Sequence, residues 1–309
     1  MSLAEGFSLR RGAKDPEFAT GSTPRGITLD SAGNIYTVNE LSRSVSKITP
    51  DGTSTVNWAK TGLGANAITL DSAGNLYTAN ELSSSVSKIT PDGTSTVNWA
   101  KTGKGPVGIT IDSNGNIYTA NYFAGTVSKI TPDGVSDRNW ANVGTKPIWL
   151  TIDSAGNIYA INQGSNNVSK ITPGGKSTVN WGPDDAEAAS GMKPYAITID
   201  SAGNTYTANY GSNNVSKITP DGVSTTDWAA TDTKPIAITI DSAGNIYTAN
   251  LGSDNVSKIT PDGVSTTNWA ATGGFPRGIT VDSVGNIYTA NQKSNNVSKI
   301  TPDTTPTST

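Results

Sequence analysis

One short phrase, Asp-Ser-x-Gly-Asn, occurs seven times along this chain of 309 residues and constrains its fold more than any other feature. Successive copies begin 41, 41, 41, 47, 41 and 41 residues apart. A period of about 40 to 50 residues is typical of propellers, solenoids and other repeat arrays. An uninterrupted array predicts a single domain in spite of the length of the chain. The phrase begins at Asp30, Asp71, Asp112, Asp153, Asp200, Asp241 and Asp282.

Each unit except the last contains four short segments with the composition of β-strands, as the second unit illustrates. These segments cover residues 66–71, 76–80, 85–90 and 94–99. Gly74 and Gly93 lie in two of the connecting turns, where glycine adopts the positive φ that other residues resist. No segment shows helical periodicity. We therefore predict an all-β fold, a seven-bladed β-propeller of four-stranded antiparallel blades, and regard a linear β-solenoid as the competing interpretation.

The last unit lacks a fourth strand, because its third strand is followed only by a Thr-rich tail over residues 304–309. The spacing from Gly12 to Phe18 equals that from Gly52 to Trp58 in the fourth strand of the first unit. We therefore predict that residues 7–20 complete the last blade, so that residues 1–303 form one closed propeller. The alternative is that residues 1–22 are partly vector-derived and that the match is accidental.

The composition excludes several classes of function. Histidine is absent, which removes His-based catalytic triads and the usual zinc and non-haem iron ligand sets. The net charge is -3 without a basic run, so no nucleic-acid partner is expected. Cysteine is also absent, which excludes disulfides. No cofactor or metal is expected, and we expect a monomer.

The sequence shows neither a membrane span nor a signal peptide. No stretch approaches the roughly 18 apolar residues of a membrane-spanning helix, and residues 1–20 lack the apolar core of a signal peptide. The compartment stays open: the protein is either intracellular, or extracellular or on the cell surface after removal of a signal.

The repeated unit resembles the NHL repeat. The resemblance rests on the run from Pro106 to Asn121, on Val127-Ser128-Lys129-Ile130 and on Pro132-Asp133-Gly134, and it covers residues 24–303. NHL propellers mostly act as binding platforms or extracellular sensor domains. The resemblance therefore implies binding without naming a ligand.

The period and the fourth strand are also similar to those of the streptogramin (virginiamycin B) lyases, which share this propeller. The resemblance would imply an enzyme that opens a cyclic depsipeptide with the help of histidine and a metal. This chain has no histidine onto which such a role could be carried. The similarity therefore extends to the fold and not to the activity.

Three residue types recur at fixed places in the units, and we interpret all three as structural. Asn80 and its equivalents end the second strand, where their amides can bond the backbone of the following loop. Trp99 and its equivalents lie in the fourth strand and can lock neighbouring blades. Lys88 and its equivalents lie in the third strand, with ammonium groups expected in solvent. The alternatives are a ring of amides around a ligand or cation, and aromatic rings that bind sugars.

Residues that differ between units are better candidates for function, because the repeat does not explain them. They concentrate in the loop after the second strand and in the connection to the next unit, which an up-and-down blade places on the same face. Variation on a constant scaffold is typical of binding through loops. Neutral drift is the alternative. The candidate ligand-binding residues are Glu40, Glu81, Tyr122, Phe123, Trp149, Gln163, Tyr195, Tyr210, Phe275 and Arg277.

The leading hypothesis is a non-enzymatic propeller that binds a peptide, protein or glycan on this variable face. One alternative is a lyase or lactonase-like enzyme that uses a divalent cation. Oxygen ligands would then come from Glu40 with Glu81, or from Asp184, Asp185 and Glu187. The other alternative is a consensus-like or recently duplicated repeat protein without a specific ligand.

Overall fold

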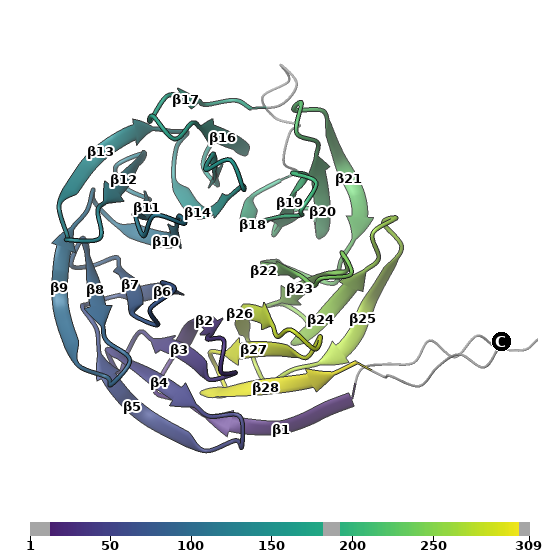
Figure 1. Cartoon of the computed structure of the whole chain (residues 1–309). Helices are drawn as coiled ribbons and strands as arrows, with labels where there is room; N and C mark the ends of the chain where they lie inside the picture. The colour runs from purple at the N-terminus through teal and green to yellow at the C-terminus, as the bar shows by residue number, and fades with distance from the viewer. Residues whose placement is uncertain (1–12, 182–191, 303–309) are drawn as a thin grey trace, which may run out of the picture.

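The structure is a computed structural model that describes residues 13–181 and 192–302, and these residues form a closed ring of seven four-stranded antiparallel sheets (Figure 1). The predicted all-β, seven-bladed propeller is confirmed. The described residues contain no helix, and consequently none long and apolar enough to cross a membrane. The acidic segment 184–187, residues 7–12 and the tail 304–309 lie outside the described residues.

Blades 1 to 4 follow one another along the chain, and each runs from an inner to an outer strand. Blade 1 contains β2 (Pro24–Leu29), β3 (Ile35–Asn39), β4 (Ser44–Ile48) and β5 (Ser54–Lys60). Blade 2 contains β6 (Ala65–Leu70), β7 (Leu76–Asn80), β8 (Ser85–Ile89) and β9 (Ser95–Lys101). Blade 3 contains β10 (Pro106–Ile111), β11 (Ile117–Asn121), β12 (Thr126–Ile130) and β13 (Ser136–Asn142). Blade 4 contains β14 (Pro147–Ile152), β15 (Ile158–Asn162), β16 (Asn167–Ile171) and the short β17 (Ser177–Thr178).

Blades 5 and 6 have the same plan, whereas blade 7 takes its outer strand from the start of the chain. Blade 5 contains β18 (Pro194–Ile199), β19 (Thr205–Asn209), β20 (Asn214–Ile218) and β21 (Ser224–Ala230). Blade 6 contains β22 (Pro235–Ile240), β23 (Ile246–Asn250), β24 (Asn255–Ile259) and β25 (Ser265–Ala271). Blade 7 contains β26 (Pro276–Val281), β27 (Ile287–Asn291), β28 (Asn296–Thr301) and β1 (Ala13–Ala19).

The ring is closed by the antiparallel pairing of β1 with β28, which lie side by side in Figure 1. Phe18 is opposite Val297 in this pair, and the Glu17 carboxylate accepts a hydrogen bond of 2.6 Å from the Asn296 amide. Phe18 occupies the place that tryptophan holds in the other six blades. Both ends of the described chain therefore meet in one sheet.

The hydrophobic core is divided into seven clusters, one at each junction between neighbouring blades. At the junction of blades 1 and 2, for example, Val38 and Ala59 pack with Ile68 and Leu76. Every blade is thus covered on both faces by its neighbours. Since burial of apolar surface is the main stabilising term, the blades stabilise one another.

In blades 1 to 6 a tyrosine–tryptophan stack locks the blade to the next one. In blade 2 the ring centroids of Tyr77 and Trp99 lie 5.6 Å apart. Trp99 also lies beneath the turn of blade 3, since a Cβ on Gly134 would come within 3.0 Å of its indole ring. This contact confirms the interpretation of the tryptophans. The ammonium group of Lys88, which we expected in solvent, instead lies 5.7 Å and 5.4 Å from the two ring centroids, where cation–π attraction stabilises it.

The repeated Asp-Ser-x-Gly-Asn turn is held together by its aspartate. Asp71 accepts hydrogen bonds from the Asn75 backbone at 2.8 Å, the Asn75 amide at 2.8 Å and the Tyr77 hydroxyl at 3.0 Å. Burial alone would raise the pKa of Asp71, but the hydrogen bonds outweigh burial and lower this pKa. Burial and the same carboxylate raise the pKa of Tyr77, so the hydroxyl stays a donor.

The repeated asparagines are structural, although their partners differ from the loop backbone that we expected. The Asn80 amide donates to the hydroxyls of Ser85 at 3.3 Å and Ser87 at 2.9 Å, and its oxygen accepts from Thr78 at 3.0 Å. The Ser87 hydroxyl also accepts the Gly62 N–H at 3.2 Å, from the segment that arrives from blade 1. The buried network therefore connects neighbouring blades and offers no ring of free amides.

Blade 4 breaks this network at one point. Ala160 stands where the other six blades have threonine, and the buried oxygen of Asn162 consequently lacks a hydrogen-bond partner. A buried acceptor without a donor costs about 1–3 kcal/mol.

Removal of residues 1–20 should open the ring, because β1 is the neighbour of β28 on its outer side. Unpaired strand edges promote aggregation. We expect a lower melting temperature and loss of monodispersity in size-exclusion chromatography. A synthetic peptide of residues 11–22 should restore both properties, whereas a scrambled peptide should not. An unchanged melting temperature and a monodisperse profile would show that this pairing does not hold the ring closed.

Acid should destabilise the protein through the four repeated aspartates whose pKa values are lowered on folding, Asp30, Asp71, Asp112 and Asp200. Because the pKa of Asp71 is lowered on folding, its contribution is complete above the ordinary value of 3.8 and is lost as the pH falls through the folded value. We therefore expect urea midpoints that are constant near neutral pH and fall below about pH 4. Asp71→Asn should be less stable at neutral pH and less sensitive to acid, and Tyr77→Phe should show a weaker form of both effects. An acid dependence identical to that of the unmodified protein in both variants would contradict this account.

Ala160→Thr should stabilise the protein by about 0.5–1.5 kcal/mol, because the new hydroxyl can donate to the buried oxygen of Asn162. The free energy of unfolding in urea measures this gain. Ala160→Val is the matched control, since valine has the shape of threonine without its hydroxyl. An equal gain in both variants would mean that packing, and not the hydrogen bond, is responsible.

Candidate functional site

The variable connections all lie on one face of the ring, which we call the loop face. In blade 2 the N–H groups of Glu81 and Leu82 donate to the carbonyls of Gly64 and Leu63 at 2.8 and 3.1 Å. These bonds join the loop after the second strand to the segment that enters the blade. The repeated turns lie on the opposite face, where a Cβ on Gly74 would lie 3.5 Å from Pro91.

Each blade contributes one pair of side chains to the loop face around the centre of the ring. One member is the second residue of the innermost strand, and the other directly follows the second strand. In blade 4 the second residue, Ile148, is buried, and Trp149 faces the centre in its place. These mouth pairs are Arg25 and Glu40, Asn66 and Glu81, Val107 and Tyr122, Trp149 and Gln163, Tyr195 and Tyr210, Ile236 and Leu251, and Arg277 and Gln292.

The mouth pairs of blades 7, 1 and 2 are polar and internally bonded. Arg25 donates to the Glu40 carboxylate at 2.6 Å through both Nε and Nη2. The Asn66 amide donates to Glu81 at 2.6 Å. Arg277 Nε donates to the Gln292 side-chain oxygen at 2.6 Å. We call these three neighbouring blades the polar sector.

The mouth pairs of blades 3 to 6 are mainly aromatic and aliphatic, and we call these blades the apolar sector. The rings of Tyr195 and Tyr210 lie 6.1 Å apart at an angle of 38°. Tyr122 packs edge-on against Phe123 with 5.0 Å between centroids, and the ammonium group of Lys146 lies 5.8 Å from the Tyr122 ring. The face therefore combines an apolar arc with a polar one.

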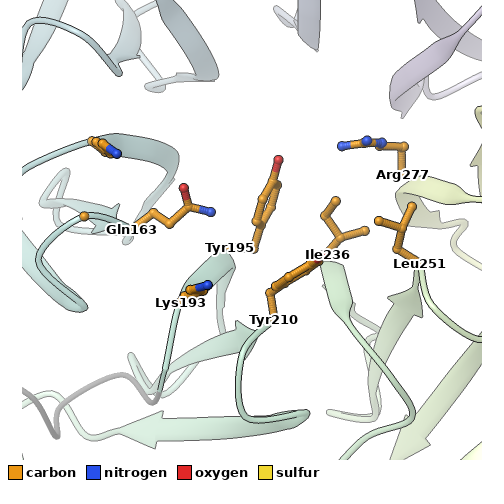
Figure 2. Close-up of a pocket in the computed structure, with 9 residues that line it drawn as sticks. Gln163, Lys193, Tyr195, Tyr210, Ile236, Leu251 and Arg277 are labelled. Carbon is orange, nitrogen blue, oxygen red and sulfur yellow. The ribbon is translucent and has the colours of Figure 1, made fainter.

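One depression of the loop face, which we call the main depression because residues of blades 4 to 7 line it, has a volume of about 440 Å³ and lies beside the junction of the two sectors. Figure 2 shows Tyr195 standing between Gln163 and Lys193 on one side and Arg277 on the other, with the guanidinium group turned toward the tyrosine. Pockets of this size suit small ligands or single side chains of a larger one. The depression is lined by Lys146, Gln163, Gly164, Lys193, Tyr195, Tyr210, Ile236, Leu251 and Arg277.

Two further depressions adjoin the main one. A small central mouth of about 40 Å³ shares Tyr195, Ile236 and Arg277 with it and adds Trp149. A second depression of about 460 Å³ lies over blade 3 and is lined by Tyr122, Phe123, Ala124, Gly125, Thr145 and Lys146. The three therefore form a nearly continuous surface from blade 3 to blade 7.

The electrostatics of the main depression are dominated by cations. Burial lowers the pKa of the Arg277 guanidinium, and the nearby charge of Arg25 lowers this pKa further. Tyr195 and Glu40 oppose the shift. An arginine nevertheless stays protonated in proteins, so Arg277 is a charged group in a partly desolvated place.

The structure brings some of the residues predicted from the sequence together and separates others. Gln163, Tyr195, Tyr210 and Arg277 line the main depression, and Trp149 lines the central mouth. The remaining candidates lie elsewhere on the loop face. Tyr122 and Phe123 line the depression over blade 3, Glu40 and Glu81 are bonded within the polar sector, and Phe275 is half-exposed beside Lys293.

Five residues that line the main depression, Gly164 and four others, were not among the candidates predicted from the sequence. Lys146 and Lys193 directly precede the proline that begins the innermost strand, and Ile236 and Leu251 form the mouth pair of blade 6. An alignment of the units on that proline would have singled out these positions, because they vary while their neighbours repeat.

The site does not fit a divalent cation. Among the described residues, no group of three or more acidic side chains could hold a metal ion. Glu40 and Glu81 are each bonded to a different partner, and the lining of the main depression contributes three basic side chains and no carboxylate. Carboxylate and carbonyl oxygens are the ligands that Ca²⁺ and Mg²⁺ require.

Solved structures share this fold. A streptogramin B lyase is 20% identical, with a TM-score of 0.81 over 96% of this chain and 99% of that one. A catalytically inactive histidine-to-alanine variant of virginiamycin B lyase from Staphylococcus aureus, solved with quinupristin, is 19% identical, with a TM-score of 0.76 over 96% and 97% of the two chains. Hydrazine synthase from Kuenenia stuttgartiensis is 18% identical, with a TM-score of 0.77 over 98% and 100%. At these identities the likeness shows the fold alone.

Sequence comparison supplies the family. No curated protein matches the chain significantly. The profile of the virginiamycin B lyase family, however, matches residues 13–191, which are more than half of the 309 residues. The seven-bladed architecture is also compatible with the NHL resemblance of the repeat. The chain belongs to the virginiamycin B lyase family.

Proposed function

We propose that the protein is a non-enzymatic binding propeller, which holds a peptide, protein or glycan on its loop face at the main depression and the central mouth. One observation carries the proposal. The mouth pairs differ from blade to blade, whereas the core, the turns and the aromatic stacks around them repeat. Exposed variation over a rigid scaffold is the usual arrangement of loop-borne recognition.

The chemistry of the mouth pairs also favours recognition. Their variation is sorted into an apolar sector and a polar sector, and Tyr195 of the apolar sector and Arg277 of the polar sector line the same two depressions. Tyrosine and arginine are enriched among the residues that contribute most to binding energy at interfaces. A pocket with apolar walls and a few fixed polar groups is typical of ligand sites.

Two observations favour binding over lyase chemistry. The histidine-to-alanine variant of the Staphylococcus aureus lyase is catalytically inactive, and this chain has no histidine at all. The main depression also lacks the carboxylates that a divalent cation would need. The remaining groups, tyrosine, lysine and arginine, can bind and orient a ligand.

Peptide and glycan arrays probed with the purified protein test the proposal. We expect Tyr195→Ala and Tyr210→Ala each to weaken a ligand found in this way by about tenfold or more, because aromatic anchors dominate binding energy. Val264→Ala, at an exposed site on the opposite face, should leave the affinity unchanged. Trp140→Ala should instead cost about 3–5 kcal/mol of stability, since its ring packs between blades 3 and 4.

The array experiment can also contradict the proposal. If the affinity of a ligand depends on Val264 and not on the two tyrosines, the ligand binds the face opposite the loop face, which contradicts the proposal. Metal-dependent opening of a streptogramin or a lactone by the pure protein would identify an enzyme instead.

A further inference from the structure

We propose that the main depression recognises an organic carboxylate that carries an aromatic or branched aliphatic group, with Arg277 as the residue that binds the carboxylate. This inference rests on the proposed function, because it names the chemistry of the ligand at the same site. The carboxylate belongs either to a small acid or to the C-terminus of a peptide.

The starting point is a comparison of two arginines at equivalent places in neighbouring blades. Arg25 is neutralised by the Glu40 carboxylate, whose Oε2 lies 2.6 Å from both Nε and Nη2. Arg277 has a neutral partner at the same place, the Gln292 side chain, at 2.6 Å from Nε. The repeat could supply a carboxylate here and does so in blade 1. Among the described residues, Arg277 therefore has no carboxylate partner within its own blade, and only Tyr195 and the more distant Glu40 of blade 1 stabilise its charge.

The geometry of Arg277 leaves the correct donors for a carboxylate. Its Nε is occupied by Gln292, which fixes the plane of the guanidinium group. The guanidinium group is turned toward Tyr195 and is hydrogen-bonded to its side chain, so a bound carboxylate would share or replace this contact (Figure 2). A guanidinium binds a carboxylate through two parallel N–H bonds, and such bonds are stronger where water is partly excluded. Burial at this place lowers the pKa of Arg277, and an anion would relieve that cost.

The surroundings of Arg277 add further positive charge. Lys146 and Lys193 also line the depression, and none of its nine described lining residues is acidic. The described aspartates on the loop face of blade 6 are bonded elsewhere. Asp232 accepts from the Asn255 amide at 2.7 Å, and Asp254 accepts from the Phe275 backbone at 2.7 Å. Clustered charge of one sign in a concave site attracts the opposite charge.

The rest of the lining is suited to an apolar body next to the carboxylate. The rings of Tyr195 and Tyr210, whose centroids lie 6.1 Å apart, offer an aromatic surface, and Ile236 and Leu251 form the adjoining wall. Aromatic groups pack on such surfaces with an energy beyond that of burial alone. A volume of about 440 Å³ accommodates one aromatic amino acid with its carboxylate.

The experiment uses two matched pairs of probes. The first pair is N-acetyl-phenylalanine and its amide, and the second is a pentapeptide that ends in phenylalanine with a free or an amidated C-terminus. Calorimetric titration of the full chain should show that at least one free acid binds about tenfold or more tightly than its amide. A preference confined to the first pair identifies a small acid, and one confined to the second identifies a peptide C-terminus.

Two single-atom exchanges in the protein complete the test. Gln292→Glu gives Arg277 the partner that Arg25 already has, and we expect the acid to bind about tenfold more weakly while the amide is unaffected. Glu40→Gln is the matched control, which removes a negative charge from the polar sector and should not weaken the acid. Both variants keep the hydrogen-bond geometry. Arg277→Met, with its melting temperature measured in parallel, replaces Gln292→Glu if that variant does not fold.

The outcomes separate this inference from the proposed function. Equal binding of acid and amide, or binding of the acid that neither Gln292→Glu nor Arg277→Met weakens, would overturn carboxylate recognition. The proposal that the loop face binds a ligand would then still be supported by the ligands found on the arrays. Absence of binding by all four probes, together with array ligands that carry no carboxylate, would also overturn the inference alone.

Discussion

The packing of each blade between its two neighbours is the constraint on which the rest of the structure depends. Within residues 13–181 and 192–302 seven apolar clusters lie at the junctions, and no blade has a core of its own. The ring must therefore be closed for all seven junctions to be complete, and the pairing of β1 with β28 completes blade 7 at the closure. The junction of blades 7 and 1 has the smallest cluster of buried residues, and Phe18 replaces the tryptophan found at the same place in the other blades.

This constraint explains why residues on the two faces of the ring differ to different extents between the blades. The Asp-Ser-x-Gly-Asn turns, the aromatic stacks and the asparagine networks each connect strands or blades, so a change at these positions costs stability. The mouth pairs mostly contact each other within a blade and can change as a pair. Three different pairs occupy equivalent positions in the repeat: Arg25 with Glu40, Tyr195 with Tyr210, and Arg277 with Gln292. Recognition can therefore vary without loss of the fold.

Blade 4 shows the cost of departures from the repeat at buried positions. Its Ala160 leaves the oxygen of Asn162 without a donor, and Thr205 in blade 5 buries a hydroxyl without a partner where five other blades have isoleucine and one has leucine. Trp149, by contrast, replaces glycine or alanine and faces the centre of the ring. The first two changes weaken the scaffold, whereas the third adds an aromatic surface beside the main depression.

The sequence by itself determined the number of blades, the strands, the turns and the face that carries variation, because these follow from a period of about 41 residues and from local turn chemistry. It also identified Tyr195, Tyr210, Gln163 and Arg277 as candidates. Only the tertiary structure decided that these four residues share one depression with Lys146 and Lys193, whereas Phe275 does not line it. Lys146 and Arg277 are 131 residues apart and belong to different blades, so no local pattern encodes their proximity. The curvature of the closed ring brings them together. Only in this arrangement does the neutral Gln292, in place of a carboxylate, affect the charge of a site that is shared between blades.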